Sequence, residues 1–337
     1  MRPVPLVSGW NLVPFIQFLE GIGAPVARWL AESRISPGLA DAPHRSVPLR
    51  HALDFADRAA RAEGAESLGI DVGRHTAAEC LGSFGATLRR CVTLYDRVRA
   101  SCHLLSRMNN CESMWLERVG PHARLHARID CDREPGSQHG EDFTLMLMVE
   151  AIGRAAGPGW RPDAISLPGR RSQRFARDEL FRRVSMSYGA PDITVAFAAE
   201  LLSRPLRPRV AAEAAGLPAA QGPPEDHDIP ADFVESLEDA VMSLLPLGCP
   251  TVHDLADIIH LKPRTLQRHV AACGTSLRRI IDDARFSLAA EYLRDPGVSV
   301  TDMALDLGYG DSTAFTRAFH RRAGVSPTVY RQQGLSA

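Results

Sequence analysis

Two segments near the C-terminal end of the chain repeat one pattern. In the first segment, Thr251 is followed three residues later by Asp254, and in the second, Ser299 is followed at the same interval by Asp302. A hydroxyl residue with an acidic residue three positions later is typical of the N-cap of a helix. In both segments an apolar residue and an alanine come next, and the small alanine allows a second helix to cross closely. The pattern predicts two copies of one helical unit.

The similarity continues into a second helix in each copy. Leu266 and Val270 in the first copy correspond to Phe315 and Phe319 in the second, and four-residue spacing places each pair on one face of a helix. Two short helices joined by a turn form a helix-turn-helix motif, whose second helix can enter the major groove of DNA. A long helix expected at Leu277–Arg294 would span ~27 Å at ~1.5 Å per residue, close to the ~34 Å turn of B-DNA. The duplication therefore indicates a DNA-binding regulator that contacts successive major-groove segments.

Composition agrees with a soluble multidomain protein. The chain has 337 residues with a net charge of −1, but residues 262–337 contain eleven Lys and Arg against seven Asp and Glu. That local excess permits contact with phosphates. The longest apolar stretch, Phe143–Ile152, is too short to cross a bilayer, and the N-terminus lacks a targeting signal. We therefore expect a cytoplasmic protein that does not contact membranes.

Composition along the chain predicts a multidomain fold. An α+β N-terminal domain at residues 1–204 is followed by a linker rich in Pro and Gly at 205–230, with a possible short helix at Val210–Leu217, and by an all-α domain at 231–337. The N-terminal helices are expected at Leu12–Ala31, Leu49–Glu63, Thr76–Leu105 and Asp142–Ala156. The strands are expected as a hairpin of Ser113–Val119 and Leu125–Ile129, with short strands at Ala164–Leu167, Val184–Tyr188 and Ile193–Phe197.

The C-terminal segment from Phe233 to Arg331 resembles the DNA-binding domain of the AraC/XylS family of bacterial transcription regulators. The residues that carry this resemblance are Arg264–Arg268, Ala304–Tyr309, Phe315–Phe319 and Gly324–Pro327. The resemblance implies an all-α domain with two helix-turn-helix motifs joined by a long helix. It also implies double-stranded promoter DNA and RNA polymerase as partners.

The segment from Leu12 to Leu206 more loosely resembles the arabinose-binding type of N-terminal domain in the same family. Its marks are Leu68-Gly69-Ile70 and the stretch from Phe175 to Leu206. The resemblance implies a regulatory domain that senses a small-molecule effector or forms a homodimer, and it does not imply arabinose. Phe143, Leu145, Met146, Met148 and Phe197 are candidates to line an apolar pocket, although ordinary core packing is the preferred interpretation.

Eight residues are the candidates for contact with DNA. Leu266 and Val270 are expected to face inward, which leaves Arg264, Thr265, Gln267 and Arg268 on or near the outer face of the first recognition helix. Arginine can donate two hydrogen bonds to guanine and glutamine can pair with adenine, each contributing about 1–3 kcal/mol of discrimination. Thr265 is better suited to a phosphate. The resemblance assigns base reading to positions 264, 267 and 268.

In the second recognition helix, the residues that match the groove-facing positions of the family are Ser312, Thr313, Thr316 and Arg317. Because hydroxyl groups predominate there, we expect weaker base discrimination and more contact with phosphates. Further candidates for the DNA backbone are Arg278, Arg279, Arg321 and Arg322, and solvated surface charge is an equally good interpretation of these four.

The cysteines and histidines do not form a recognisable metal or catalytic motif. Three cysteines recur every eleven residues, at Cys80, Cys91 and Cys102, and we expect them to share one face of a helix as core thiols. Cys111 and Cys131 lie close enough in sequence that a redox sensor stays an alternative. His122 and His126 have the spacing of metal ligands on a helix, but the surrounding alternation favours a strand with surface histidines.

Three functions remain open from the sequence. The first is an effector-responsive, sequence-specific transcription regulator, and the second is a DNA-binding regulator whose N-terminal domain only dimerises. The third, an enzyme fused to a DNA-binding domain, would need an activated thiol beside a basic or metal-binding group. Since Gly-rich phosphate loops and catalytic motifs are lacking, we expect neither an enzyme nor a cofactor.

Overall fold

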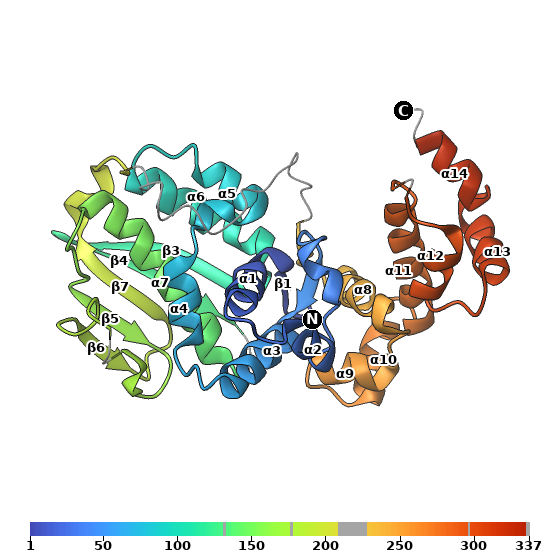
Figure 1. Cartoon of the computed structure of the whole chain (residues 1–337), viewed down its shortest axis with the longest axis horizontal. Coiled ribbons are helices and arrows are strands. Elements are labelled where there is room, and N and C mark those ends of the chain that lie inside the picture. The colour runs from blue at the N-terminus through green and yellow to red at the C-terminus, as the bar shows by residue number, and fades with distance from the viewer. Residues whose placement is uncertain (131–132, 176–177, 208–227, 296, 335–337) are drawn as a thin grey trace.

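The computed structural model describes residues 1–130, 133–175, 178–207, 228–295 and 297–334 (Figure 1). An α+β region forms the N-terminal part and an all-α region the C-terminal part, which confirms the predicted fold class. Most of the predicted linker lies outside the described residues, and so does the short helix considered at Val210–Leu217. The division at 204 and 231 therefore stays a prediction.

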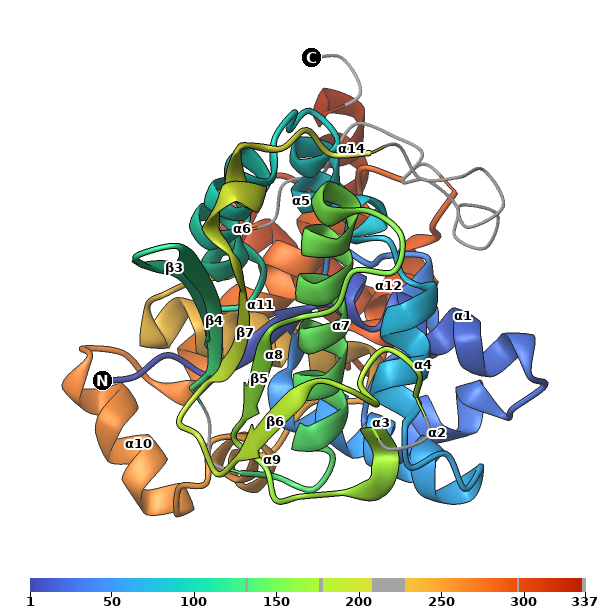
Figure 2. The same ribbon diagram turned by 90° about the vertical axis from the view of Figure 1, so that its left-hand side faces the viewer.

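One five-stranded sheet forms the centre of the N-terminal part, in the order β3-β4-β7-β5-β6. The strands are β3 (Glu112–Val119), β4 (His122–Ile129), β5 (Ala164–Leu167), β6 (Ser185–Tyr188) and β7 (Ile193–Ala198). Neighbours pair antiparallel except β5 and β6, which are parallel. The long helix α7 (Ser137–Ala156) lies across the sheet in Figure 2, and alternate residues of β4, such as Leu125, are buried beneath it. The predicted hairpin, the three short strands and this helix are confirmed, although α7 begins at Ser137 instead of Asp142 and β4 at His122 instead of Leu125.

Helices pack beside the sheet: α1 (Val13–Gly21), α2 (Val26–Glu32), α3 (Leu49–Ala62), α4 (Leu68–His75), α5 (Gly82–Leu88) and α6 (Leu94–Met108). The single helix expected at Leu12–Ala31 is wrong, because the chain turns between α1 and α2. Gly23 has a φ of 80° there, and Pro25 cannot continue a hydrogen-bonded helix. The apolar period continued through the turn because both short helices pack on the same core.

The helix expected at Thr76–Leu105 is also wrong. A 3-10 turn at Ala78–Cys80 precedes α5, and Thr93 starts α6 afresh with a capping box to Asp96. Cys80, Cys91 and Cys102 therefore lie on three different segments and do not share one helical face. Cys111 is buried, with its thiol 3.7 Å from the Leu6 carbonyl oxygen, while Cys131 lies outside the described residues.

A buried ion network joins these helices to α7. The Arg97 side chain is 1% exposed and lies between Glu79 and Glu150, and Arg154 also contacts Glu79. Burial by itself would raise the pKa of Glu79, but the charges and hydrogen bonds of the two arginines outweigh it and lower the pKa to about 2. The ionised carboxylate therefore stabilises the N-terminal part.

Replacing Glu79 with Gln is expected to lower the free energy of unfolding at pH 7 by about 3 kcal/mol, because a shift of one pKa unit corresponds to about 1.4 kcal/mol. The folded-state pKa is depressed, so this contribution is present above pH 4.5, the ordinary value, and is lost as the pH falls toward about 2. Urea unfolding from pH 7 to pH 3 should give a flatter pH dependence for the variant. Glu66→Gln, on an exposed side chain, is the matched control. Equal pH profiles for Glu79→Gln and the wild type would contradict the role of the network.

The C-terminal part consists of α8 (Phe233–Leu244), α9 (Val252–Ile258), α10 (Pro263–Ala272), α11 (Leu277–Tyr292), α12 (Val300–Asp306), α13 (Ser312–Ala323) and α14 (Pro327–Gly334). The first residues of the chain also belong to its core: Val4 and Leu6 are fully buried in one apolar cluster with residues of these helices. The Val4 amide donates to Ser236 Oγ on α8 at 2.8 Å. Sequence patterns did not reveal this, because a short apolar run does not indicate its partner.

The N-terminal part holds the C-terminal helices through a two-stranded sheet and several polar contacts. Strands β1 (Leu6–Ser8) and β2 (Ser46–Pro48) pair antiparallel next to α8. Ser46 Oγ donates to Asp239 on α8 at 2.9 Å, and Arg45 pairs with Glu291 on α11 at 3.0 Å. Arg50 pairs with Asp257 on α9 at 2.8 Å. The two parts therefore pack directly against each other in this structure.

Candidate nucleic-acid interface

Two helix-turn-helix units occupy the C-terminal part, as Figure 1 shows for α9–α10 and α12–α13. In the first unit Thr251 accepts from the Asp254 amide, and the Asp254 side chain accepts in return from the Thr251 amide. In the second unit Ser299 accepts from the Asp302 amide at 3.1 Å and its hydroxyl donates to the Asp302 carboxylate at 2.6 Å. The repeated pattern thus starts a helix in both copies.

The turns that follow differ in sequence but share a backbone conformation. His260 after α9 has a φ of 52°, and Gly308 after α12 has a φ of 73°. Glycine adopts this left-handed region without a steric cost, whereas histidine is strained there. His260 is also paired with Glu134 of the N-terminal part. The first turn is therefore in contact with the neighbouring domain.

Apolar side chains fix the rotation of each recognition helix. Leu266 and Val270 on α10 are 0% and 1% exposed, and Phe315 and Phe319 on α13 are 1% and 3% exposed. The two phenylalanine rings lie 5.8 Å apart, and Phe319 meets Tyr330 of α14 edge to face at 5.3 Å. Because these positions point inward, the opposite face of each helix is turned to solvent.

The four candidates on α10 lie on that outer side. Arg264, Gln267 and Arg268 are exposed and Thr265 is half-buried. Within the described residues, their side chains make no hydrogen bond or ion pair. Their donors are therefore available to an external partner.

On α13, Thr313 and Arg317 are exposed, while Ser312 and Thr316 are half-buried. Asp311 caps the start of the helix, and its carboxylate accepts from the Ala314 amide at 2.6 Å. That cap satisfies a backbone amide that lacks a partner within the first turn of α13. The structure thus brings all eight candidates onto the two second helices of the motifs.

The four further arginines separate into two pairs. Arg322 reaches Asp283 on α11 at 2.6 Å, and Arg279 lies 3.8 Å from the same residue. These two have a partner inside the protein, which sequence reasoning did not indicate. Arg278 and Arg321 are exposed and form no ion pair within the part of the chain that the structure describes, so they remain candidates for phosphate contact.

Helix α11 connects the two units and ends at Tyr292, two residues before the predicted end at Arg294. Its 16 residues span ~24 Å at ~1.5 Å per residue. Arg285 on α11 donates to the Leu307 carbonyl at 3.0 Å and lies 5.0 Å from the centre of the Tyr309 ring. This arginine holds the turn of the second unit against the connecting helix, and no sequence pattern indicated that role.

Other candidate sites gain no support as metal centres. His122 and His126 lie on β4, as predicted, with His126 stacked on Trp115 at 5.0 Å and 3.4 Å from Glu117. The described residues contain no group of three or more potential metal ligands. Among those same residues, no helix is both long and apolar enough to cross a membrane.

The fold and the paired motifs define a helix-turn-helix transcription regulator with an N-terminal α+β domain. Residues 23–206 match the model of the arabinose-binding domain found at the N-terminus of AraC transcription regulators, and residues 255–333 match a helix-turn-helix domain. The chain belongs to the AraC family of transcription regulators.

Several known proteins are similar to this chain. The HTH-type transcriptional regulator VirS of Mycobacterium tuberculosis is 25% identical over 98% of this chain and 97% of its own length. The ornithine utilization regulator of Pseudomonas aeruginosa is 36% identical over 30% of this chain and 31% of its own. Among solved structures, the transcriptional regulator CdpR from Pseudomonas aeruginosa has 20% identity and a TM-score of 0.38 over 91% of this chain and 96% of that chain.

Proposed function

We propose that the protein is a sequence-specific regulator that binds promoter DNA with both recognition helices and responds to a small-molecule effector through its N-terminal domain. One observation carries the proposal: eight polar side chains gather on the outer sides of α10 and α13, while the apolar positions between them are buried. RNA polymerase and a second copy of the chain are the proposed protein partners.

The two motifs are expected to contribute differently. Arg264, Gln267 and Arg268 supply the directional donors that distinguish bases. Ser312, Thr313 and Thr316 carry short hydroxyl groups, which suit phosphate oxygens, and Arg317 is the single charged group of that set. We infer that α10 provides most of the base discrimination and that α13 sets the register along the duplex.

Each subunit is expected to protect about two helical turns of DNA, ~20 base pairs, because two motifs occupy adjacent major-groove segments. Genome-wide mapping of bound sites would give the operator, and cleavage footprinting on that sequence would measure the protected length. A double substitution, Thr316→Ala with Arg317→Ala, should shorten protection at one side only. Protection of a single helical turn by the wild-type protein would argue against engagement of both motifs.

The effector part of the proposal has an alternative, in which the N-terminal domain only dimerises. Thermal-shift measurements against a panel of metabolites separate the two, because a ligand that binds the folded state raises its apparent stability. The cavities of the N-terminal domain favour the effector-responsive form. Phe143 and Met148 line a small cavity of about 60 Å³ between the sheet and the helices, while Leu145, Met146 and Phe197 are core.

A further inference from the structure

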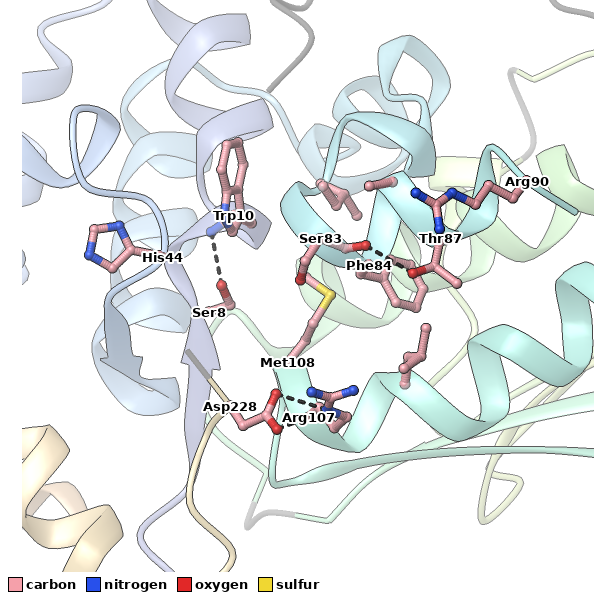
Figure 3. A pocket seen from close by; sticks show the side chains of 13 residues that line it. Ser8, Trp10, His44, Ser83, Phe84, Thr87, Arg90, Arg107, Met108 and Asp228 are labelled. Carbon is pink, nitrogen blue, oxygen red and sulfur yellow. Dashed lines mark hydrogen bonds and ion pairs between the residues drawn. The ribbon is translucent and has the colours of Figure 1, made fainter. Parts of the chain in front are cut away.

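A second cavity of the N-terminal part, of about 170 Å³, opens near the place where the chain enters the C-terminal helices (Figure 3). Its walls come from the turn after β1, from α5 and from the end of α6. An engineered apolar cavity of about 150 Å³ holds benzene. The space therefore suits a compact body about the size of one aromatic ring.

The floor of this cavity is apolar. Leu81, Phe84 and Met108 line it and also line the smaller cavity inside the domain. Trp10 forms a side wall, and it approaches α5 closely because Gly82 has no side chain: an added Cβ would lie 2.5 Å from the indole Nε1. The floor and wall thus offer an aromatic and aliphatic surface to the body of a ligand.

The rim of the cavity carries an excess of positive charge. Arg107 donates from Nε to both carboxylate oxygens of Asp228, at 2.8 and 2.9 Å. Arg90, across the cavity in Figure 3, is exposed and forms no ion pair with any described residue. Among the described residues that line the cavity, Asp228 is the one carboxylate, so two guanidinium groups accompany a single negative charge there. Guanidinium groups bind carboxylates through charge-assisted hydrogen bonds.

Asp228 is also the point at which the cavity reaches the DNA-binding part. The Ile229 amide donates to the Arg107 carbonyl at 2.8 Å, and Asn110 donates to the Pro230 carbonyl at 2.8 Å. Ile229 belongs to the apolar core of the C-terminal helices, and α8 starts three residues after Pro230. The Arg107–Asp228 pair thus ties the entry to the DNA-binding part to the end of α6.

We propose that this cavity binds a compact organic carboxylate with a ring-sized apolar body, whose carboxylate replaces that of Asp228 on Arg107. One carboxylate replaces another, so the Arg107 guanidinium keeps a negatively charged partner. Residues 228–230 then lose one of their contacts with α6. Binding and release are linked: the ligand weakens the Arg107–Asp228 contact by the same factor by which that contact weakens ligand binding. The inference rests on the proposed effector-responsive function and names the class of effector.

The test uses full-length protein without DNA and benzoate as the probe, with benzamide as its neutral counterpart and inorganic phosphate as an anion without an apolar body. Calorimetric titration is expected to give a benzoate Kd of about 1 mM or tighter and no measurable affinity for the other two. Arg107→Gln should weaken benzoate binding at least about tenfold, because a hydrogen bond to a charged group is lost. Arg99→Gln, on the same helix but not lining this cavity, should bind as the wild type does.

A second variant keeps the proposal testable if Arg107→Gln folds poorly. Asp228→Asn removes the competing carboxylate and should tighten benzoate binding, and benzoate should speed hydrogen exchange at the Ile229 amide in the wild type. Absence of benzoate binding, equal affinity in Arg107→Gln, or weaker binding in Asp228→Asn would each overturn the proposal. Operator binding by the same preparations is measured separately. Wild-type protein that binds the operator but not benzoate would refute only the carboxylate site. Wild-type protein that does not bind the operator would refute the proposed function.

Discussion

Operator affinity is expected to fall at least about a hundredfold when Arg264 and Arg268 are both replaced with alanine, since each bidentate contact with a base contributes about 1–3 kcal/mol. Both side chains are exposed on α10 and have no partner among the described residues, so their removal should leave folding unchanged. Arg268→Ala alone should produce a smaller loss in the same direction. Fluorescence anisotropy with labelled operator, at fixed salt concentration, measures the affinity.

Two comparisons make this result specific. Arg118→Ala removes an exposed arginine of the same charge from β3 in the N-terminal part and should leave operator affinity unchanged. Nonspecific DNA should lose much less affinity than the operator in the double variant, because phosphate contacts carry no sequence information. Unchanged operator binding, with the fold retained in thermal unfolding, would show that α10 does not read the bases.

Phe315→Ala is expected to destabilise the second motif by about 3–5 kcal/mol, the usual cost of emptying a buried phenylalanine site. The side chain is 1% exposed and touches both Tyr309 and Phe319. Its loss removes the contact that fixes how α13 is rotated against α12. Urea unfolding should show the destabilisation, and the footprint on the operator should shorten at the side assigned to α13.

The matched control is Val329→Ala, which shortens an apolar side chain that is 39% exposed on α14. Such a surface change is expected to stay within about 0.5 kcal/mol. If Phe315→Ala lowered the free energy of unfolding no more than this control does, the packing of Phe315 would not stabilise the second motif.

The sequence predicted best where the local signal and the packing agree. Capping residues and apolar spacing placed α9, α10, α12 and α13 because each of these short helices buries one face against its neighbours. The hairpin of β3 and β4 was predicted from its strand-like sequence, and Gly120 in the turn between the strands has a φ of 60°. The errors came where one apolar pattern covered several segments, as at Gly23 and Thr93.

Within the candidate sites, the sequence indicated which residue types face outward but not which of them have partners. In the sequence, Arg322 and Arg268 are both candidates for contact with DNA. In the structure, Asp283 lies 2.6 Å from Arg322, whereas no described residue pairs with Arg268. The cavity beside Arg107 was not predicted, because its walls come from segments as distant in sequence as Trp10 and Asp228. Proximity between residues so far apart in the chain produces no periodic pattern or fixed spacing in the sequence.

The amino-acid order alone determined that this chain carries two similar DNA-binding units on one connecting helix, since caps, turns and inward positions are all local choices. Tertiary structure decided how the first unit is held. Arg34 contacts Asp254, whereas the equivalent Asp302 of the second unit is exposed and bonds within its own cap. The two similar local sequences have different surroundings because burial and charge pairing depend on which distant residues the folded chain brings alongside.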